Sequence, residues 1–534
     1  MRKGDIRPFP RGVPERLKRD GLWRDETLAD LLARHTAKQP NKTAILSGPD
    51  RLTYSELDRR MRSLASGLKG LGVRAGDVVA VQLPNSIEFV VAYLAINRIG
   101  AVMQTLHLPY RIAEIENLTE HSQAKALICL QKYRDYPIGE QALKIVEKSK
   151  TLKHVVVVAG EAPGALRFGD VANAAGRDLG PVPRADEPSL VLYTSGTTAS
   201  PKGVLTDHRV FLSNARLSAI ELGITASDIV LNAAPFTHLY GLFSLHLGLY
   251  VGGIASLLPA FVPQEFAQAV VKTHATVLFT APAHCSALLR AKLLEPTAFQ
   301  SVRTLVISGS ICPPDIADGV AAQLKNGKVL QLWGMTEIQA GAYTRPGDPP
   351  EIRHRTIGRA SPGNELRIVG DDGKPAAAGT EGELQIRGAS VASGYFANDE
   401  ANKAAFAEGG WFRSGDLGKL DAQGNLTITG RLKDVINRGG VKFNPADVEA
   451  AIAKMAGVQA CAIVPYKDAV LGEKACAFVQ LGTNVKMTLD VILQHLEHAG
   501  IAKNKWPERL EIVGQMPLTP TNKVIKSALK ITTG

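Results

Sequence analysis

A loop rich in glycine and hydroxyl residues has the composition of a phosphate-binding segment. It reads Tyr193-Thr-Ser-Gly-Thr-Thr-Ala-Ser-Pro-Lys-Gly203 and directly follows the strand-like run SLVLY at 189–193. Small residues let backbone N–H groups approach phosphate oxygens, hydroxyls add donors, and Lys202 supplies a positive charge. The order GxxxxGK[ST] of a Walker A loop is not found. The segment predicts an anion site, with an ordinary surface loop as the alternative for such a composition.

Four later segments place single charged or aromatic residues among glycines and hydroxyls. They read QLWGMTE (331–337), WFRSGD (411–416), GRLKDVIN (430–437) and PLTPTNK (517–523). Taken singly, each has a structural explanation: Asp416 caps a turn, Lys523 is an exposed lysine, and Trp333 belongs to a core. Their chemistry is nevertheless coherent, because carboxylates, lysines and a flat aromatic ring are what a magnesium nucleotide requires.

Together and in this order, the five segments resemble the signature motifs of the adenylate-forming superfamily. That superfamily comprises acyl-CoA synthetases, adenylation domains of peptide synthetases and luciferases. Three positions depart from the usual motifs: Ala199 and Asn522 stand where glycine is usual, and Trp333 replaces a tyrosine. Ala199 removes no phosphate donor, asparagine at position 522 tolerates left-handed backbone, and the flat ring of Trp333 can still pack on adenine as the usual tyrosine would. The resemblance extends over essentially the whole chain.

The resemblance implies an ATP site with a magnesium ion. Thr194, Glu337 and Lys523 are implied to be catalytic, with Glu337 the magnesium ligand. By the same resemblance, Asp416 is expected to accept hydrogen bonds from the ribose hydroxyls, and Lys523 to contact the acid carboxylate and the bridging phosphate oxygen. The full set of nucleotide-binding residues is Thr194, Ser195, Gly196, Thr197, Thr198, Lys202, Trp333, Gly334, Met335, Thr336, Asp416, Arg431 and Lys523.

The resemblance also implies a second half-reaction in which a thiol attacks the acyl-adenylate. A small C-terminal domain is expected to rotate about Lys433, so that Lys523 vacates the face that the thiol needs. Arg438, Gly439 and Gly440 are expected to line the tunnel for the thiol arm, where glycines leave room. The thiol is either coenzyme A, which we prefer, or the phosphopantetheine of an acyl carrier protein.

The pocket for the acid is placed by the resemblance around eight residues. They are His238, Tyr240, Phe243, Ser308, Gly309, Ser310, Gly334 and Ala340. His238 either seats against the acid or fills the pocket mouth, and both readings stay open. The aromatic residues favour an apolar acyl group, and Phe236 stands where amino-acid activators place an aspartate.

Two segments indicate which class of carboxylic acid is the substrate. GLWRDETL (21–28) and INRGGVKF (436–443) look like segments of aryl-acid and alicyclic-acid ligases, whereas dihydroxybenzoate activators carry an asparagine where this chain has Thr237-His238. The expected function is therefore ATP-dependent, AMP-forming ligation of an alicyclic, medium-chain fatty or aryl acid to coenzyme A, in fatty or aromatic acid metabolism. A non-catalytic nucleotide-binding or nucleic-acid-binding protein is disfavoured because Glu337, Asp416 and Lys523 are all present.

The elements that must position these residues alternate between strands and helices, which predicts an α/β fold. Strands are expected at 77–83, 125–130, 154–158, 189–193, 276–280, 303–307 and 328–332, and a helix at 54–70 opens on a capping box of Thr53 and Glu56. Glycine- and aspartate-rich turns after about residue 360 predict a small β-barrel-like subdomain.

The large N-terminal AMP-binding domain, built of parallel αβ subdomains, is expected to span 1–432, and a small α+β domain 433–534. In the small domain we expect a helix from Pro445, strands at 460–464, 474–481 and 509–513, and a helix near 488–498.

Charge, cysteine content and hydropathy argue against a nucleic-acid-binding, secreted or membrane-spanning protein. The net charge is +11, but basic and acidic residues alternate along the chain, which predicts a solvated surface and no nucleic-acid partner. The five cysteines form no CxxC pair, and the first ten residues lack the apolar core of a secretory signal, so a cytoplasmic location is expected. The apolar stretch 242–262 is interrupted by glycines and a proline, which favours a buried helix, turn and strand over a membrane span. A monomer or homodimer is expected.

Overall fold

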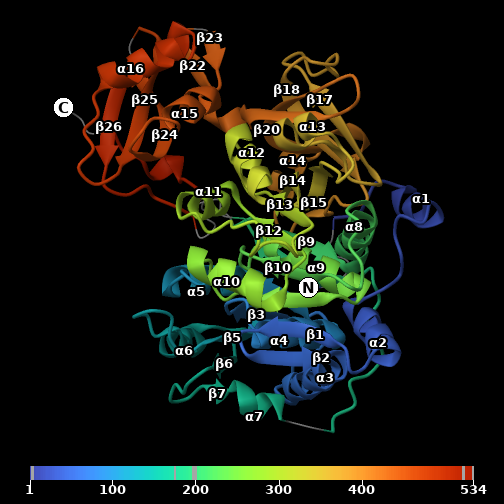
Figure 1. Cartoon of the computed structure of the whole chain (residues 1–534). Coiled ribbons are helices and arrows are strands. Elements are labelled where there is room, and N and C mark those ends of the chain that lie inside the picture. Colours follow the sequence, from blue (N-terminus) through green and yellow to red (C-terminus); the bar gives the residue numbers. More distant parts are fainter. Residues whose placement is uncertain are drawn as a thin grey trace. The chain divides into compact units, whose positions relative to one another are not determined.

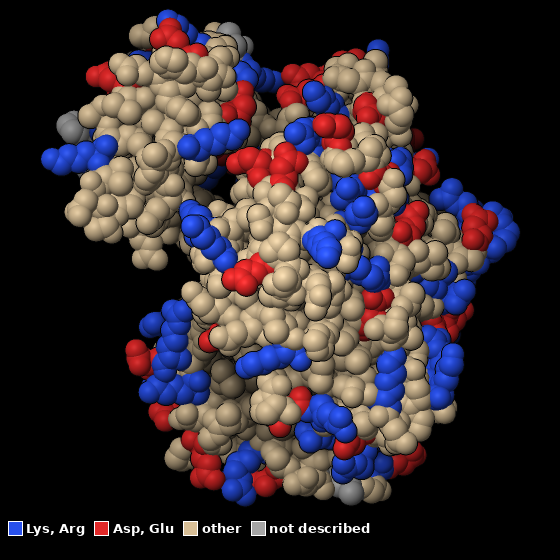
Figure 2. Space-filling view, in the orientation of Figure 1, with Lys and Arg blue, Asp and Glu red and all other residues tan. Residues whose placement is uncertain are grey.

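The computed structural model describes residues 1, 5, 7–173, 176–194, 201–439, 441–468, 470–519 and 523–531. The chain divides into two compact units (Figure 1). The first unit contains residues 1–365 and 386–412, and the second contains residues 366–385 and 413–534. Figure 2 shows Lys and Arg interspersed with Asp and Glu over the face in view, as the alternation of charges along the sequence predicts.

The first unit is built on two mainly parallel sheets. The eight-stranded sheet has the order β19 (Gly394–Tyr395), β9 (Gly203–Asp207), β8 (Pro188–Tyr193), β4 (Val102–Thr105), β3 (Val78–Gln82), β5 (Ala124–Leu130), β6 (His154–Val158) and β7 (Leu166–Arg167). The pairs from β8 through β7 are parallel, whereas β9 and β19 add an antiparallel edge.

The nine-stranded sheet has the order β16 (Arg359–Ala360), β15 (Gln339–Tyr343), β14 (Lys328–Met335), β13 (Thr304–Ile307), β12 (Val277–Thr280), β10 (Ile229–Asn232), β11 (Ile254–Leu257), β1 (Thr43–Ser47) and β2 (Asp50–Thr53). Its pairs from β14 through β1 are parallel, and both edges end in antiparallel hairpins. The seven strands predicted between residues 77 and 332 are therefore present, each within three residues of its expected ends.

Helices cover these sheets. They are α1 (Val13–Arg19), α2 (Leu28–Lys38), α3 (Tyr54–Gly70), α4 (Ile87–Arg98), α5 (Ile112–Ser122), α6 (Ile138–Lys148), α7 (Phe168–Ala172), α8 (His208–Glu221), α9 (Leu239–Val251), α10 (Pro263–Thr273), α11 (Pro282–Arg290), α12 (Pro314–Gln323), α13 (Pro350–Arg355), α14 (Asp399–Ala405) and the 3₁₀ turn η2 (Glu408–Gly410). One apolar cluster joins residues of α3, α4 and α9 to β3 and β11, so the two sheets share a core.

Capping residues near in sequence determine where α3 begins and where α9 ends. The capping box of α3 forms as predicted: Glu56 N–H donates to Thr53 Oγ1 at 3.2 Å, and Thr53 N–H donates to Glu56 Oε2 at 2.8 Å. The apolar stretch 242–262 contains the C-terminal part of α9, the capping residue Gly252 with φ of 71°, and β11, so the predicted buried helix, turn and strand are confirmed. Among the residues that the structure describes, no helix combines the length and apolarity of a membrane span.

A four-stranded sheet has the order β17 (Asn364–Val369), β18 (Gly382–Gly388), β20 (Phe412–Leu420) and β21 (Leu426–Arg431), and its first three strands each contain a boundary between the units. The second unit continues through η3 (Leu432–Asp434) into a sheet of β23 (Val441–Phe443), β22 (Ile436–Arg438), β25 (Gly472–Leu481), β24 (Val458–Asp468) and β26 (Arg509–Val513). Its helical elements are α15 (Ala446–Ile452), α16 (Leu489–His498), η4 (Lys503–Lys505) and η5 (Lys526–Ala528). The predicted mixed α/β fold is confirmed. A domain boundary at residue 433 stays a prediction.

Candidate active site

The two ends of the predicted phosphate loop are held together by the antiparallel strands β8 and β9. Thr194 N–H donates to the Lys202 carbonyl at 3.1 Å, and Tyr193 pairs with Gly203 across the two strands. A Cβ on Gly203 would lie 3.0 Å from the Tyr193 ring, which explains the glycine after the lysine. Ser195, Gly196, Thr197 and Thr198, predicted to contact phosphate, lie outside the described residues.

The second predicted ATP motif forms the hairpin of β14 and β15. Trp333, Gly334 and Met335 end β14, and Thr336 and Glu337 form the turn before Gln339. A Cβ on Gly334 would lie 2.2 Å from the Gln339 carbonyl oxygen, so only glycine fits this tight crossing. Glu337 is only 9% exposed, and its Oε1 accepts a hydrogen bond of 2.8 Å from the Tyr395 hydroxyl. A buried, hydrogen-bonded carboxylate thus stands at the hairpin tip.

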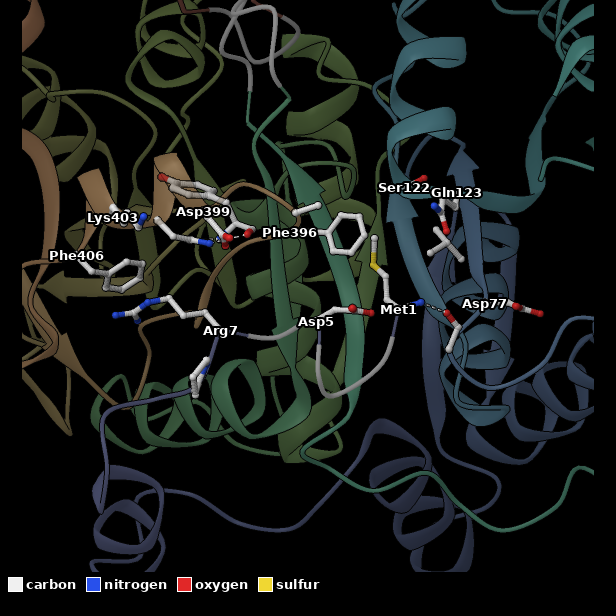
Figure 3. Close-up of a pocket in the computed structure, with 16 residues that line it drawn as sticks. Met1, Asp5, Arg7, Asp77, Ser122, Gln123, Phe396, Asp399, Lys403 and Phe406 are labelled. Carbon is white, nitrogen blue, oxygen red and sulfur yellow. Dashed lines mark hydrogen bonds between the residues drawn. The ribbon is translucent and has the colours of Figure 1, made fainter. Parts of the chain in front are cut away.

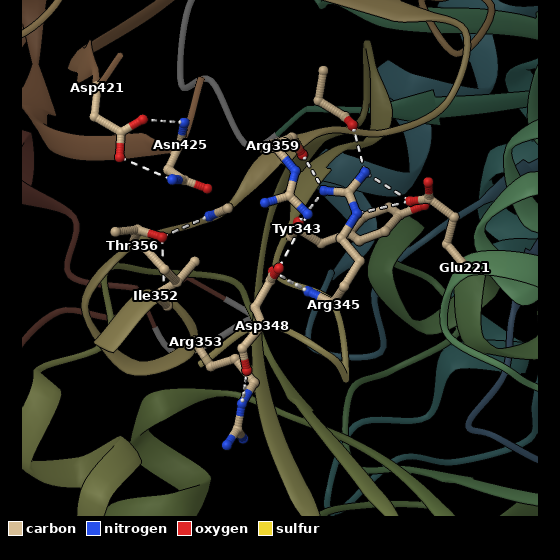
Figure 4. A network of polar contacts seen from close by, with 12 residues as sticks. Glu221, Tyr343, Arg345, Asp348, Ile352, Arg353, Thr356, Arg359, Asp421 and Asn425 are labelled. Atoms are coloured by element: carbon tan, nitrogen blue, oxygen red, sulfur yellow. Dashed lines mark hydrogen bonds and ion pairs between the residues drawn. The ribbon is translucent and has the colours of Figure 1, made fainter. Parts of the chain in front are cut away.

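An arginine-centred network braces the far end of this hairpin (Figure 4). The Arg345 guanidinium contacts the Glu221 carboxylate at 2.7 Å and donates to the Arg359 carbonyl at 2.8 Å. Asp348 accepts from the Arg345 backbone N–H at 2.7 Å and from Arg359 Nη2 at 3.0 Å. These contacts link the segment after β15 to the end of α8 and to β16. The open end of the hairpin that carries Glu337 at its tip is therefore held in place by polar contacts.

Three residues predicted for the acid pocket belong to one apolar cluster. Tyr240 and Phe243 from α9 contact the Phe279 ring edge-on, with ring centroids 5.7 Å and 6.1 Å away, and Ala340 from β15 joins the same cluster. The Tyr240 hydroxyl donates to the carbonyls of Thr280 at 3.1 Å and Val306 at 3.0 Å. Burial raises the pKa of that hydroxyl, so it stays a neutral donor and its ring is fixed by the sheet.

His238 lies at the start of α9, one residue before this cluster. Its Nδ1 accepts from Tyr240 N–H at 3.3 Å, which caps the helix, and its ring stacks on His107 with centroids 6.5 Å apart. His107 was not predicted from the sequence; its Nδ1 lies 2.9 Å from Thr237 Oγ1, and burial lowers its pKa to about 4. Two imidazole rings therefore stand side by side next to the predicted pocket.

The segment 308–310 follows the end of β13. Ser308 is buried and its N–H donates to the Thr280 carbonyl at 3.0 Å, whereas Ser310 is exposed. Gly309 has a φ of +97°, and a Cβ on it would meet only Ala281, at 3.9 Å, so open space adjoins this glycine. Ser308 thus continues the sheet that fixes Tyr240, and Ser310 turns toward solvent.

In the second unit, Asp416 and Arg431 face each other across β20 and β21. They are register partners, and Arg431 Nε lies 3.1 Å from Asp416 Oδ1. Asp416 is 5% exposed, whereas the Arg431 side chain is 46% exposed, so a buried carboxylate is held by a guanidinium that reaches solvent. Lys433 follows in η3 and is exposed, with no regular sheet pairing in that turn.

The remaining predicted residues of the second unit lie in two further places. Arg438 at the end of β22 pairs with Glu508, and its Nη1 donates to the Asn504 carbonyl at 3.2 Å. Gly439 adopts a φ of +60°, and Gly440 lies outside the described residues. Lys523 is half-buried; its backbone N–H donates to Thr519 Oγ1 at 3.0 Å, and its carbonyl accepts from Thr519 N–H at 2.7 Å.

Tyr395, which the sequence did not predict, contacts two predicted site residues at once. Besides its bond to Glu337, its ring faces Lys202, whose Nζ lies 5.4 Å from the ring centroid. Tyr395 lies 58 residues from Glu337 in the sequence, and no motif links the two positions, so the sequence pattern could not predict their contact.

A cavity of about 890 Å³ lies elsewhere in the first unit (Figure 3). The N-terminal residues, the end of α5 and the segment around α14 line it, and Arg7, Asp77 and Lys403 give it charges of both signs. Of the predicted active-site residues that the structure describes, none lines this cavity, although Tyr395 does.

The donor set fits a magnesium nucleotide. Magnesium is usually held by one or two carboxylates together with substrate phosphates, and Glu337 offers a carboxylate of that kind. No group of three or more histidine, cysteine, aspartate or glutamate side chains suited to a metal is found among the described ranges.

Comparisons with known proteins agree with the motifs. The AMP-binding enzyme family model matches residues 32–396, and that of the AMP-binding enzyme C-terminal domain matches residues 447–523. The salicyl-AMP ligase / salicyl-S-ArCP synthetase of Mycobacterium tuberculosis is 33% identical over 98% of this chain and 94% of its own length. The medium-chain fatty-acid–CoA ligase of Escherichia coli is 30% identical over 96% of this chain and 91% of its own length. ATP-bound MatB from Rhodopseudomonas palustris has a TM-score of 0.84 at 28% identity, covering 94% of this chain and 98% of MatB. The resemblance drawn from the five motifs is confirmed.

Proposed function

We propose that this chain, which belongs to the AMP-binding enzyme family, activates a hydrophobic carboxylic acid with ATP and transfers the acyl group to coenzyme A. Membership makes the chain an adenylate-forming, ATP-dependent ligase. The acid, the thiol and the roles of individual residues are the proposal.

One observation carries the proposal: a single hairpin bears both the buried carboxylate and a wall of the apolar cluster. Glu337 lies at the tip of β14 and β15, and Ala340, three residues later, packs in the cluster that contains Tyr240 and Phe243. An apolar acyl group on that cluster would present its carboxylate to the hairpin tip. This favours acids with an alicyclic, medium-chain or aromatic body.

In the proposed first step, a carboxylate oxygen of the acid attacks the α-phosphorus of ATP and pyrophosphate leaves. Because two anions meet, positive charge must stabilise the converging oxygens. Lys202 at the end of the phosphate loop and Lys523, assigned by the motif resemblance, are the proposed donors. Magnesium held by Glu337 and phosphate oxygens would neutralise part of the charge on the triphosphate. Asp416 is proposed to accept from the ribose hydroxyls.

In the proposed second step, a thiolate attacks the acyl carbonyl carbon, and AMP leaves with its electron pair on the phosphate oxygen. The residues after 432 are proposed to rotate about Lys433 between the steps, and Arg438 and Gly439 to line the thiol path. Support for coenzyme A comes from the fatty-acid–CoA ligase relative.

Acid-dependent exchange of labelled pyrophosphate into ATP tests the first step. We expect exchange with cyclohexanecarboxylate, benzoate and octanoate, weak exchange with acetate, and none with phenylalanine, because no described carboxylate of the apolar cluster pairs an ammonium group. Glu337→Gln is the negative control: it keeps the shape of the side chain but removes the charge proposed to bind magnesium, so exchange should be lost with every acid. Absence of exchange with every acid would overturn the proposal, whereas preference for acetate or phenylalanine would overturn only the apolar pocket.

A carrier-protein thiol is the second candidate acceptor. The relative named a salicyl-S-ArCP synthetase, at 33% identity, supports it. Incubation of the enzyme with the preferred acid and ATP, followed by free coenzyme A or a phosphopantetheinylated carrier protein, separates the two by mass spectrometry. Acyl-CoA formed at turnover rates supports the first candidate, and acylation of the carrier alone supports the second.

A further inference from the structure

Tyr395 stands beside the strand that leaves the phosphate loop. It forms β19 with Gly394 and pairs in antiparallel register with Val204 of β9, two residues after Lys202. Phe396 N–H donates to the Gly203 carbonyl at 2.7 Å, which extends this pairing to the end of the loop. The backbone of Tyr395 is therefore fixed to the eight-stranded sheet.

The same segment is bonded to the turn that carries Glu337 in the nine-stranded sheet. Ser390 Oγ donates to the Ile338 carbonyl at 2.8 Å, and Ala392 N–H donates to the Glu337 carbonyl at 2.7 Å. Residues 390–396 thus connect two sheets of the first unit at the places where each sheet presents a predicted ATP motif.

The Tyr395 side chain lies between those two motifs. Its hydroxyl donates to Glu337 Oε1 at 2.8 Å, while Lys202 Nζ lies 5.4 Å from its ring centroid, within the range of a cation–π contact. The side chain is buried, at 7% exposure, so water competes little for either contact. One residue therefore restrains both the carboxylate and the loop lysine.

We propose that Tyr395 is a positioning residue of the magnesium–triphosphate site, in which the hydroxyl orients the Glu337 carboxylate and the ring holds Lys202. This inference rests on the proposed function for the roles of Glu337 and Lys202. A carboxylate that binds a metal is commonly oriented by a hydrogen-bond donor behind it, and loss of such a donor costs on the order of 10- to 100-fold in metal affinity or activity.

Nucleotide binding without turnover separates this role from a structural one. Calorimetry with α,β-methylene-ATP, which cannot lose pyrophosphate, is run over a range of Mg²⁺ concentrations and also in a metal-free buffer with chelator. Tyr395→Phe removes only the hydroxyl, so we expect about tenfold more Mg²⁺ for half-maximal binding and unchanged metal-free affinity. Tyr395→Leu also removes the ring, so metal-free affinity should fall as well, by about threefold.

Tyr54→Phe is the matched control. Tyr54 is fully buried in the same unit, and its hydroxyl donates to the Gly253 carbonyl at 2.8 Å, far along the chain from either motif. Both phenylalanine variants lose one buried hydrogen bond and should melt at lower temperatures, Tyr395→Phe more so because its acceptor is a carboxylate, but only Tyr395→Phe should need more Mg²⁺. An unchanged Mg²⁺ requirement in Tyr395→Phe, with normal acid-dependent exchange in the wild type, overturns this proposal alone. A wild-type enzyme that binds no magnesium nucleotide overturns the proposed function as well.

Discussion

Replacing Asp416 by asparagine tests the proposed ribose site without disturbing the fold. The side chain keeps its shape, and no charge is left buried, because the partner Arg431 is 46% exposed and is hydrated once the pair is broken. An ion pair with one partner this exposed contributes at most about 1 kcal/mol, so the free energy of unfolding should change little. The nucleotide, in contrast, would lose hydrogen bonds to a charged acceptor.

The size of that loss follows from the chemistry of the acceptor. A hydrogen bond to a charged group contributes about 1.5–3 kcal/mol, and at about 1.4 kcal/mol per factor of ten the ATP concentration for half-maximal exchange should rise about 10- to 150-fold. The concentration of acid for half-maximal exchange should stay within about twofold, because the proposed contact is to ribose alone.

Deoxynucleotides make this prediction specific. If Asp416 accepts from the ribose hydroxyls, 2′-deoxy-ATP and 3′-deoxy-ATP should be poor substrates for the wild type, yet only slightly worse than ATP for Asp416→Asn. Asp421→Asn is the control: Asp421 closes the turn of the same hairpin by accepting from Asn425 N–H at 2.8 Å. Its ATP requirement should stay near that of the wild type. Additive penalties from the Asp416→Asn change and the missing hydroxyl would show that Asp416 does not contact the ribose.

Three further outcomes are expected. Lys523→Ala should slow acid-dependent exchange at least about a hundredfold, as loss of a donor to a transition state does, while thioester formation from a preformed acyl-adenylate is much less affected; equal loss in both assays would mean that Lys523 is structural. Lys433→Pro fixes φ at the proposed pivot, so exchange should continue and thioester formation should fall sharply, and normal rates of both would place the pivot elsewhere. Burial lowers the pKa of His107 and His284 from 6.5 to about 4, so between these pH values the folded state binds fewer protons than the unfolded state. The stability of the folded state is therefore highest above pH 6.5, and it decreases as the pH falls from 6.5 through 4. Each histidine should remove about 3 kcal/mol over that window, and urea unfolding with equal midpoints at pH 7 and pH 4.5 would contradict this.

Local signals account for the parts of the fold that the sequence predicted. The helix 54–70 has its expected ends because Thr53 and Glu56 satisfy each other's backbone donors within one turn. The stretch 242–262 could be assigned to a buried helix because its glycines mark a helix end, and Gly252 does adopt the left-handed conformation there. In both cases the deciding atoms lie within a few residues of one another.

Long-range contacts account for what the sequence did not predict. Tyr395 comes to lie beside Glu337 through pairing with β9, about 190 residues earlier in the chain, and His107 comes to lie beside His238 through its contact with Thr237, 130 residues later. The sequence placed Tyr240 in an apolar pocket, but its fixed orientation depends on carbonyls of β12 and β13 that no pattern around residue 240 reveals. Such contacts depend on the order of the strands in the sheets, and the pattern of apolar residues within one segment does not predict that order.

The hairpin of β14 and β15 constrains how the proposed acid pocket can vary. A Cβ on Gly334 would lie 2.2 Å from the Gln339 carbonyl oxygen, and a Cβ on Gly341 would lie 2.8 Å from the Trp333 ring. Changes on this hairpin therefore move Glu337 as well as the pocket wall at Ala340. Tyr240 and Phe243 belong to α9, outside the hairpin, so the shape of the pocket can change there while the carboxylate stays in place. We therefore expect substitutions in α9 to change the acid preference alone, and substitutions on the hairpin to change both the acid preference and the nucleotide requirement, because the hairpin carries both Ala340 and Glu337.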